Sequence, residues 1–279
     1  MMRYPILPGA ATMALISVLA TGMAAGMAAA MPTAAAAGAP PTAPSPALRP
    51  LVLTIDDGPS LAPMPRLTPA ARHSVMRATL ARHGITAVLY VTLGFGANRP
   101  EGYALARAWS DAGHLLGNHT VSHPDIDNDA VTLANYLGEI RTCDAAMNAL
   151  PGWRRWFRAT YLHEGQDEAK REGLRRFLAD SGYRPAPVHL DSRDWLYGPR
   201  VQAALHDAQA DIAALKAEFL HQLVQRAQAL HHDGSTPIVL LMHDNLLTAL
   251  WLEDVVRALV TAGYTFVHPD RAMDDGGPR

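Results

Sequence analysis

The sequence predicts a single α/β domain, a barrel of about seven parallel strands covered by helices. Short apolar runs rich in β-branched residues alternate with longer helical patterns, which is typical of a parallel sheet. No glycine-rich dinucleotide fingerprint follows any of these runs, and this favours a barrel over an open nucleotide-binding sheet. In either arrangement, functional side chains should lie at the carboxyl ends of the strands.

The amino-terminal part of the chain is expected to stand apart from this domain. Residues 1–30 have a basic tip, an Ala- and Met-rich apolar middle and a small-residue end, the pattern of a secretory signal peptide. A retained membrane anchor is the alternative, because the stretch is long enough to span a bilayer. Residues 31–48 are rich in Ala, Pro and Thr and predict a linker. We therefore expect an exported, periplasmic or extracellular protein whose catalytic domain covers residues 49–279.

The first expected strand, residues 51–55, ends at two adjacent carboxylates. Asp56 and Asp57 are followed by Gly58 and Pro59, which interrupt regular structure. Because successive strand residues point to opposite sides, the two acids should have different roles. Burying both without compensation is unfavourable, which points to a metal or another cation nearby. A strand followed by a plain Asp-Gly turn is the alternative that these residues leave open.

The remaining elements follow in order from the same alternation of patterns. Residues 60–69 contain three prolines and predict a loop, with a lid as one interpretation. Further strands are expected at residues 86–92, 115–118, 156–158, 186–190, 237–242 and 264–267. Helices are expected at residues 70–83, 101–112, 129–150, 168–181 and 251–261, with one long helix or a helix pair at 201–231.

The cysteine count excludes a protein stabilised by internal disulfides, and the net charge argues against a nucleic-acid-binding protein. The only cysteine, Cys143, allows no internal disulfide, and its place in a helical pattern predicts a buried structural thiol. The formal net charge is -2, and the sequence contains no long run of basic residues. We therefore expect no nucleic-acid partner.

Two histidines follow the strand expected at residues 115–118. His119 and His123 are four residues apart, which brings two imidazoles to the same side as a clamp for a divalent cation. Pro124 disfavours a continuing helix, so the pair should lie in a turn. Two histidines and an aspartate form a common ligand set of hydrolytic zinc sites. Chance spacing among thirteen histidines is the alternative.

Polar residues also end the later strands. Arg158 follows a short aromatic run and would neutralise a buried acid, or lie on the surface. Asp194 and Trp195 follow the strand expected at residues 186–190, and His243 follows the most hydrophobic strand of the chain. For His243 the main alternative is a core histidine.

Five stretches, in chain order, resemble the five motifs of the polysaccharide deacetylases, carbohydrate esterase family four with its chitooligosaccharide deacetylase homology domain. They are residues 54–59 (Thr-Ile-Asp-Asp-Gly-Pro), 119–123 (His-Thr-Val-Ser-His), 157–161 (Phe-Arg-Ala-Thr-Tyr), 194–195 (Asp-Trp) and 241–243 (Leu-Met-His). The resemblance extends over about residues 51–267. It implies a distorted (β/α) barrel and a metal-dependent removal of acetyl groups from sugars.

The resemblance also assigns roles, residue by residue. It places the metal ligands on Asp57, His119 and His123. Such a site suits zinc, with cobalt or nickel as alternatives.

The catalytic roles implied by the resemblance fall on five residues. Asp56 would be the general base that deprotonates the attacking water. His243 would be the general acid, and Asp194 would keep it protonated and oriented. Arg158 would pair with Asp56 or Asp194, and the backbone N–H of Tyr161 would help to hold the developing oxyanion.

Two apolar residues, Trp195 and Leu241, would wall a small acetyl pocket in this family. The third motif departs from the family pattern, because Ala159 and Thr160 stand where prolines are usual and Leu162 stands where glycine is usual. This departure bears on the role assigned to Tyr161. His163 and Glu164, which follow, either face the cleft or lie on the surface.

The leading hypothesis is an exported metal-dependent hydrolase that deacetylates an N- or O-acetylated polysaccharide or oligosaccharide. An amidase of a small non-sugar substrate on the same barrel is one alternative. A noncatalytic glycan-binding relative is another, although the expected ligands and base are all present. Glycan grooves offer exposed aromatic side chains, and the candidates are Trp109, Trp153, Trp156, Trp195 and Trp251.

Overall fold

The computed structural model describes residues 49–230 and 236–273. The expected signal peptide, residues 1–30, and the expected linker, residues 31–48, lie outside the described residues. Within the described ranges, none of the helices combines the length and the apolar character needed to span a membrane.

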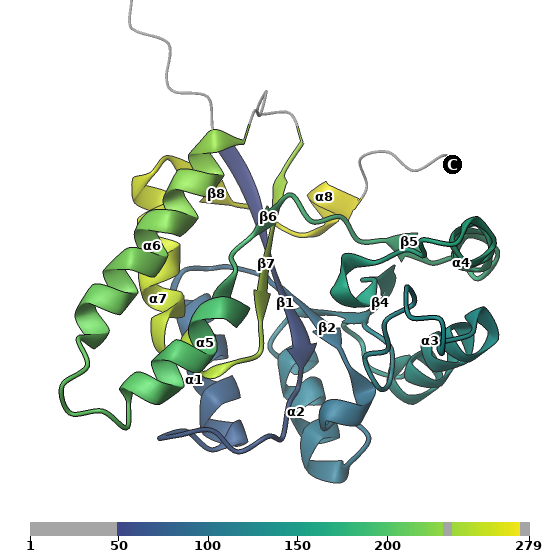
Figure 1. Ribbon diagram of the computed structural model, residues 1–279, viewed down its shortest axis with the longest axis horizontal. Helices are drawn as coiled ribbons and strands as arrows, with labels where there is room; N and C mark the ends of the chain where they lie inside the picture. The colour runs from purple at the N-terminus through teal and green to yellow at the C-terminus, as the bar shows by residue number, and fades with distance from the viewer. Residues whose placement is uncertain (1–48, 231–235, 274–279) are drawn as a thin grey trace, which may run out of the picture. The chain divides into compact units, whose positions relative to one another are not determined.

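Within the described residues, eight parallel strands form one sheet, and seven of them lie in the order β5-β4-β3-β2-β1-β7-β6 (Figure 1). They are β1 (Arg49–Gly58), β2 (Val88–Val91), β3 (Leu115–Asn118), β4 (Trp153–Phe157), β5 (Arg184–Pro185), β6 (Leu190–Asp191), β7 (Ile238–His243) and β8 (Tyr264–Phe266). The eighth, β8, pairs only with the first residues of β1. The sheet curls into a half-barrel with β5 and β6 at its edges, which confirms the predicted distorted barrel of about seven parallel strands.

Helices flank the sheet as predicted (Figure 1). They are α1 (Pro69–Arg82), α2 (Pro100–Asp111), α3 (Leu133–Met147), α4 (Glu168–Asp180), α5 (Asp194–Ala204), α6 (Ile212–Ala229), α7 (Leu246–Thr261) and α8 (Asp270–Met273), with the 3₁₀ turns η1 (Leu93–Phe95) and η2 (Thr160–Leu162). Several begin after a Thr, Asp or Asn whose side chain accepts a hydrogen bond from a backbone N–H of the first turn. These capping residues are Thr68, Thr132, Asp167, Asp211 and Asn245.

Successive residues of β1 face two different environments. Leu51, Leu53 and Ile55 are buried in the main core among side chains of α1, α2 and α7. Val52, between them, packs instead with β7 and α8 on the other face of the sheet. Asp56 continues this second row at the carboxyl end of the strand, so its carboxylate points into the half-barrel.

The structure corrects two predicted elements. The prediction of one strand at residues 186–190 is wrong, because this region contains two separate two-residue strands, β5 and β6, at opposite edges of the sheet. Pro185 and Pro187 have no backbone N–H and cannot continue one hydrogen-bonded ladder. The expected helical region at 201–231 is a pair, α5 and α6, and α5 already begins at Asp194.

Cys143 has the structural place that the sequence indicates. Its side chain is fully buried on α3, and burial raises the pKa of the thiol. A thiol in these surroundings stays protonated and unreactive at neutral pH.

Candidate active site

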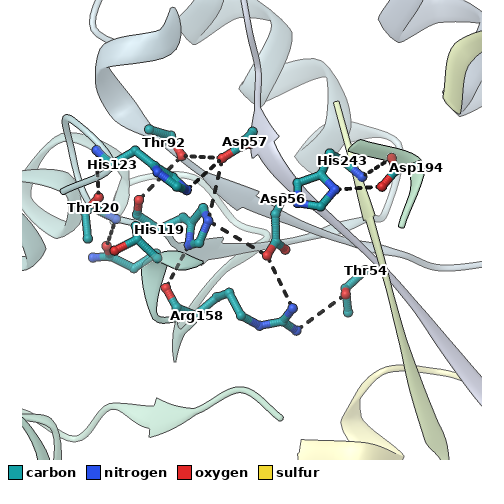
Figure 2. A network of polar contacts seen from close by, with 12 residues as sticks. Thr54, Asp56, Asp57, Thr92, His119, Thr120, His123, Arg158, Asp194 and His243 are labelled. Carbon is teal, nitrogen blue, oxygen red and sulfur yellow. Dashed lines mark hydrogen bonds and ion pairs between the residues drawn. The ribbon is translucent and has the colours of Figure 1, made fainter. Parts of the chain in front are cut away.

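The ends of β1 and β7 and the segments that follow β3, β4 and β6 bring polar side chains together at one edge of the sheet (Figure 2). β1 supplies Asp56 and Asp57, the turn after β3 supplies His119 and His123, the residue after β4 is Arg158, α5 begins with Asp194, and β7 ends with His243. A cavity of about 480 Å³ opens here, lined by both β1 acids, both histidines of the turn and His243. Chain segments far apart in sequence therefore meet where the sequence predicted functional groups.

The two adjacent acids lie on the same side of the sheet, contrary to the expected alternation. Asp57 has a φ of 67°, in the left-handed region, and this turns its side chain back toward the cavity. Asp57 Oδ1 lies 3.6 Å from His119 Nε2, and Asp56 Oδ2 lies 3.8 Å from the same atom. The acids still differ in their surroundings, since Asp56 is 2% exposed and Asp57 is 27% exposed.

The two histidines lie in a turn and not on a helix, as Pro124 indicates. Thr120 and His123 both have left-handed backbone conformations, with φ of 69° and 58°. The His123 N–H donates a hydrogen bond to Thr120 Oγ1 at 3.2 Å, which closes the turn. This conformation brings His123 Nε2 to 3.4 Å from Asp57 Oδ1.

The geometry of these three side chains fits one divalent cation. Their ligand atoms lie within 4.8 Å of one another. Ligands that are each about 2.0–2.1 Å from a tetrahedral zinc ion lie about 3.3 Å apart, close to both distances from Asp57 Oδ1. His119 Nδ1 donates to the Arg158 carbonyl at 2.7 Å, which leaves the Nε2 lone pair toward Asp57. Burial lowers the pKa of His119 to about 3, so the ring is neutral and able to bind a cation.

Asp56 is buried but only partly satisfied. Its Oδ2 accepts a hydrogen bond from Arg158 at 3.3 Å, whereas its Oδ1 has no hydrogen-bond partner among the described residues. Burial raises the pKa of Asp56, and the charges of Arg158 and His243 oppose this rise. A cation bound by Asp57 and the histidines would further favour the charged carboxylate. Asp56 therefore lines the cavity with one buried carboxylate oxygen that has no hydrogen-bond partner among the described residues.

Arg158 forms an ion pair with Asp56, and three further contacts hold its guanidinium in place. Its guanidinium donates to Thr54 Oγ1 and to the Pro187 carbonyl, and it lies over the Tyr90 ring at 4.6 Å. Asp56 and Asp194 were the two expected partners of Arg158, and in the structure Arg158 forms its ion pair with Asp56.

His243 and Asp194 form a close pair on the other side of Asp56 (Figure 2). His243 Nδ1 lies 2.7 Å from Asp194 Oδ1, and the His243 backbone N–H donates to Asp194 Oδ2 at 2.8 Å. Burial by itself lowers the pKa of His243, but the charge and hydrogen bond of Asp194 raise it to about 10. The imidazole is therefore positively charged at neutral pH, with Nδ1–H bound to Asp194 and Nε2–H available as a proton donor.

Sequence reasoning missed the residues that hold Asp194. Asn245 Nδ2 donates to Asp194 Oδ2 at 2.7 Å, Thr248 Oγ1 donates to the same oxygen at 3.1 Å, and Ser192 Oγ donates to Asp194 Oδ1 at 3.0 Å. Asn245 could have been noticed, because it directly precedes the apolar run of α7, the usual position of a helix N-cap. Three donors besides His243 keep a fully buried carboxylate ionised.

The walls of the cavity include the two predicted apolar residues, Trp195 and Leu241. Trp195 is 51% exposed, and its indole N–H donates to Asp191 Oδ2 at 3.3 Å. The other four tryptophans are buried and cannot form a glycan platform: Trp109, Trp153, Trp156 and Trp251. Further cavity-lining residues that the sequence did not single out are Gly198, Pro199 and Gln202.

Tyr161 lines the cavity from η2 and contacts His123 through its ring. Tyr161 and Leu162 both have left-handed backbone conformations, with φ of 56° and 60°. Leu162 therefore adopts a conformation that favours the glycine usual at its position in the related motif. The oxyanion role of the Tyr161 N–H stays a prediction.

His163 and Glu164, for which a place in the cleft and a place on the surface were both open, do not line the cavity. His163 pairs with Asp125 at 2.8 Å, and Glu164 forms an ion pair with Arg175. The loop at residues 60–69 also contributes no residue to the cavity lining. Its Leu61 N–H donates to the Phe95 carbonyl at 2.9 Å, so it packs beside η1 and does not cover the site as a lid.

Comparison with known proteins points to the same family as the motifs. Residues 45–177 match the family model for polysaccharide deacetylases. A chitooligosaccharide deacetylase from Rhizobium leguminosarum bv. trifolii is 29% identical over 148 residues, which span 53% of this chain and 60% of the relative. A chitooligosaccharide deacetylase from Azorhizobium caulinodans is 26% identical over 220 residues, 77% of this chain and 90% of the relative.

The fold is shared with solved structures. The chitin deacetylase of Colletotrichum lindemuthianum superimposes with a TM-score of 0.60 at 22% sequence identity, over 82% of this chain and 89% of that one. At this identity the likeness shows the common half-barrel, and the chemistry of this chain has to be argued from its own side chains.

Proposed function

We propose that this chain, whose residues 45–177 match the polysaccharide deacetylase family model, is an exported, metal-dependent hydrolase that removes acetyl groups from N-acetylated glycans of the chitooligosaccharide type. The observation that carries the proposal is the convergence of three groups. The possible cation ligands Asp57, His119 and His123 lie beside Asp56, whose Oδ2 is 3.8 Å from His119 Nε2, and the charged His243 ring lies on its other side. A carboxylate that can accept a proton and a charged imidazole that can donate one are the base and the acid that acyl transfer requires.

The reaction follows from the positions of these groups. A divalent cation, zinc in our proposal with cobalt or nickel able to fit the same ligands, would acidify a water molecule and polarise the acetyl carbonyl. Asp56 Oδ1 accepts a proton from the attacking water as the new C–O bond forms, and Arg158 keeps this carboxylate charged. The backbone N–H of Tyr161 donates to the developing oxyanion. Trp195 and Leu241 enclose the acetyl methyl group.

Breakdown of the tetrahedral intermediate uses the opposite side of the cavity. The C–N bond breaks, and His243 gives its Nε2 proton to the departing sugar nitrogen, so that the products are a free amine and acetic acid, which loses its remaining proton to solvent as acetate. Asp194 keeps Nδ1 protonated and the ring oriented throughout. Asp56 thus ends the cycle protonated and His243 neutral, and proton exchange with solvent removes the proton from Asp56 and returns one to His243.

The proposal is tested by release of the carboxylic acid, acetate from acetylated substrates and formate from formamides, from a panel of substrates by metal-reconstituted protein. The panel contains N-acetylated chitooligosaccharides, peptidoglycan, O-acetylated xylan and small non-sugar amides and formamides. We expect acetate from the N-acetylated glycans, and none when the cation is removed with a chelator. Turnover of only the small amides would replace the proposal by the amidase alternative. Glycan binding without acetate release from any substrate would favour a noncatalytic glycan-binding protein.

The charge of Asp194 sets the pH range of the reaction. His243 must be protonated to act as the acid, so its raised pKa lets activity persist as the pH rises, until the proton is lost. Asn in place of Asp194 removes the charge that opposes burial, so the pKa of His243 falls. We expect the alkaline limb of the kcat profile of Asp194→Asn to lie at least about one pH unit lower, since a unit corresponds to about 1.4 kcal/mol. An unmoved alkaline limb would exclude His243 as the titrating acid.

A further inference from the structure

The two histidines of the candidate metal site are oriented in different ways. His119 Nδ1 donates to the Arg158 carbonyl at 2.7 Å, the arrangement common for metal-binding histidines. His123 has no such bond, because its only side-chain polar contact among the described residues joins Nε2 to Asp57 at 3.4 Å. Something other than a hydrogen bond must fix the direction of this imidazole.

Aromatic rings surround His123 instead. The Phe95 ring stacks on it with centroids 5.9 Å apart and an angle of 22° between the planes. The Tyr161 ring meets it at 4.5 Å with its plane at 72°, and the His119 ring at 5.0 Å and 78°. Phe95 is thus the ring that lies parallel to His123 and restricts its tilt, a favourable offset arrangement.

The backbone fixes where Phe95 lies relative to His123. The N–H groups of Leu93 and Gly94 donate to the carbonyls of Thr120 and Val121, at 3.1 Å and 2.8 Å. The turn η1 is thereby attached to the same segment that presents His123. The Phe95 carbonyl accepts the Leu61 N–H on the other side.

The glycines on both sides of Phe95 are required by this attachment. A Cβ on Gly94 would lie 2.7 Å from the Val121 carbonyl oxygen. A Cβ on Gly96 would lie 2.6 Å from the Pro59 carbonyl oxygen. Both glycines allow close backbone contacts, so the Gly-Phe-Gly sequence places one aromatic ring between two fixed points.

We propose that Phe95 is a positioning residue of the cation site, which holds the His123 imidazole in the direction that Asp57 and His119 require. Phe95 does not line the cavity, so a direct contact with substrate does not account for its place. The inference rests on the proposed metal-dependent function and assigns to a residue outside the five motifs the orientation of one ligand.

The test is a zinc titration of the metal-free protein in competition with a chromophoric chelator. We expect Phe95→Ala and Phe95→Leu to bind zinc about threefold to tenfold more weakly than the unchanged chain, the range expected for an aromatic pair. Phe95→Tyr keeps the ring and should stay within about twofold of the unchanged chain. The cobalt-loaded Phe95→Ala protein should also show a changed visible absorption spectrum, because that spectrum reports ligand geometry.

Controls separate positioning from folding and from the proposed function. Val75→Ala truncates a similarly exposed apolar side chain on α1 and should leave zinc affinity unchanged. Thermal unfolding of the metal-free variants shows whether each is folded. Unchanged zinc affinity in Phe95→Ala and Phe95→Leu would overturn the inference and leave the proposed function standing. A loss of zinc affinity in Phe95→Tyr as large as that in Phe95→Ala would do the same. Failure of the unchanged chain to bind zinc, cobalt or nickel would overturn both.

Discussion

Replacing Asp56 by Asn is expected to lower the rate of acetate release by about 10²–10⁴-fold while the protein still binds one cation. The amide keeps the size of the side chain but cannot accept a proton at Oδ1, the atom left without a partner at the cavity. Asp56 is not one of the three residues whose ligand atoms group around the cation position, so cation binding should persist. Acetate release and zinc content, measured on the same preparation, check both halves of this expectation.

This substitution also removes the counter-charge of a buried guanidinium. Arg158 is 1% exposed and pairs with Asp56, so Asp56→Asn should unfold at a lower temperature. Rates are therefore compared well below the melting temperature of the variant. Acetate release by Asp56→Asn at the rate of the unchanged chain would rule out Asp56 as the base.

The same change one residue later should have a different effect. Asp57→Asn is expected to weaken zinc binding at least about a hundredfold, because even the loss of a group that only orients a ligand costs about 10–100-fold. Asn tolerates the left-handed backbone conformation of Asp57, so the turn should be kept. Zinc affinity is measured by competition with a chelator, and acetate release is measured with zinc at low and at saturating concentration.

The two variants form a matched pair, since an identical isosteric change is made at neighbouring positions. Excess zinc should restore activity in part to Asp57→Asn and not at all to Asp56→Asn. Equal zinc affinity of Asp57→Asn and the unchanged chain would contradict the ligand role of Asp57. Restoration of Asp56→Asn by zinc would mean that the two roles are exchanged.

Much of the site could be predicted because it depends on strand ends. Parallel strands that each end in a polar residue bring those residues to one edge of a sheet, whichever loops connect them. Asp56, His119, Arg158, Asp194 and His243 were predicted in this way, and the structure brings them together. The roles of these residues are tested only by the experiments proposed for them.

Other features depend on backbone conformation or on tertiary contacts, which periodicity does not reveal. The left-handed φ of Asp57 reverses the alternation expected along β1. Four of the five tryptophans are buried in the core. The sequence could not show which ones, because the burial of so large a side chain depends on neighbours from distant segments. The contact between Phe95 and His123 requires η1 and the turn after β3 to be hydrogen-bonded side by side, and nothing in the local sequence of either segment predicts this.

The most direct measurement is a titration of divalent cation into the metal-free protein, with bound metal and acetate release followed together on an N-acetylated chitooligosaccharide. Three side chains that share one ion predict that activity rises with zinc bound at Asp57, His119 and His123 and stops rising when this site is filled, whether or not the second group of possible ligands, Asp125, Asp127 and His163, also takes up zinc. Full acetate release without any bound cation, or one bound ion without acetate release from any acetylated glycan, would contradict the account.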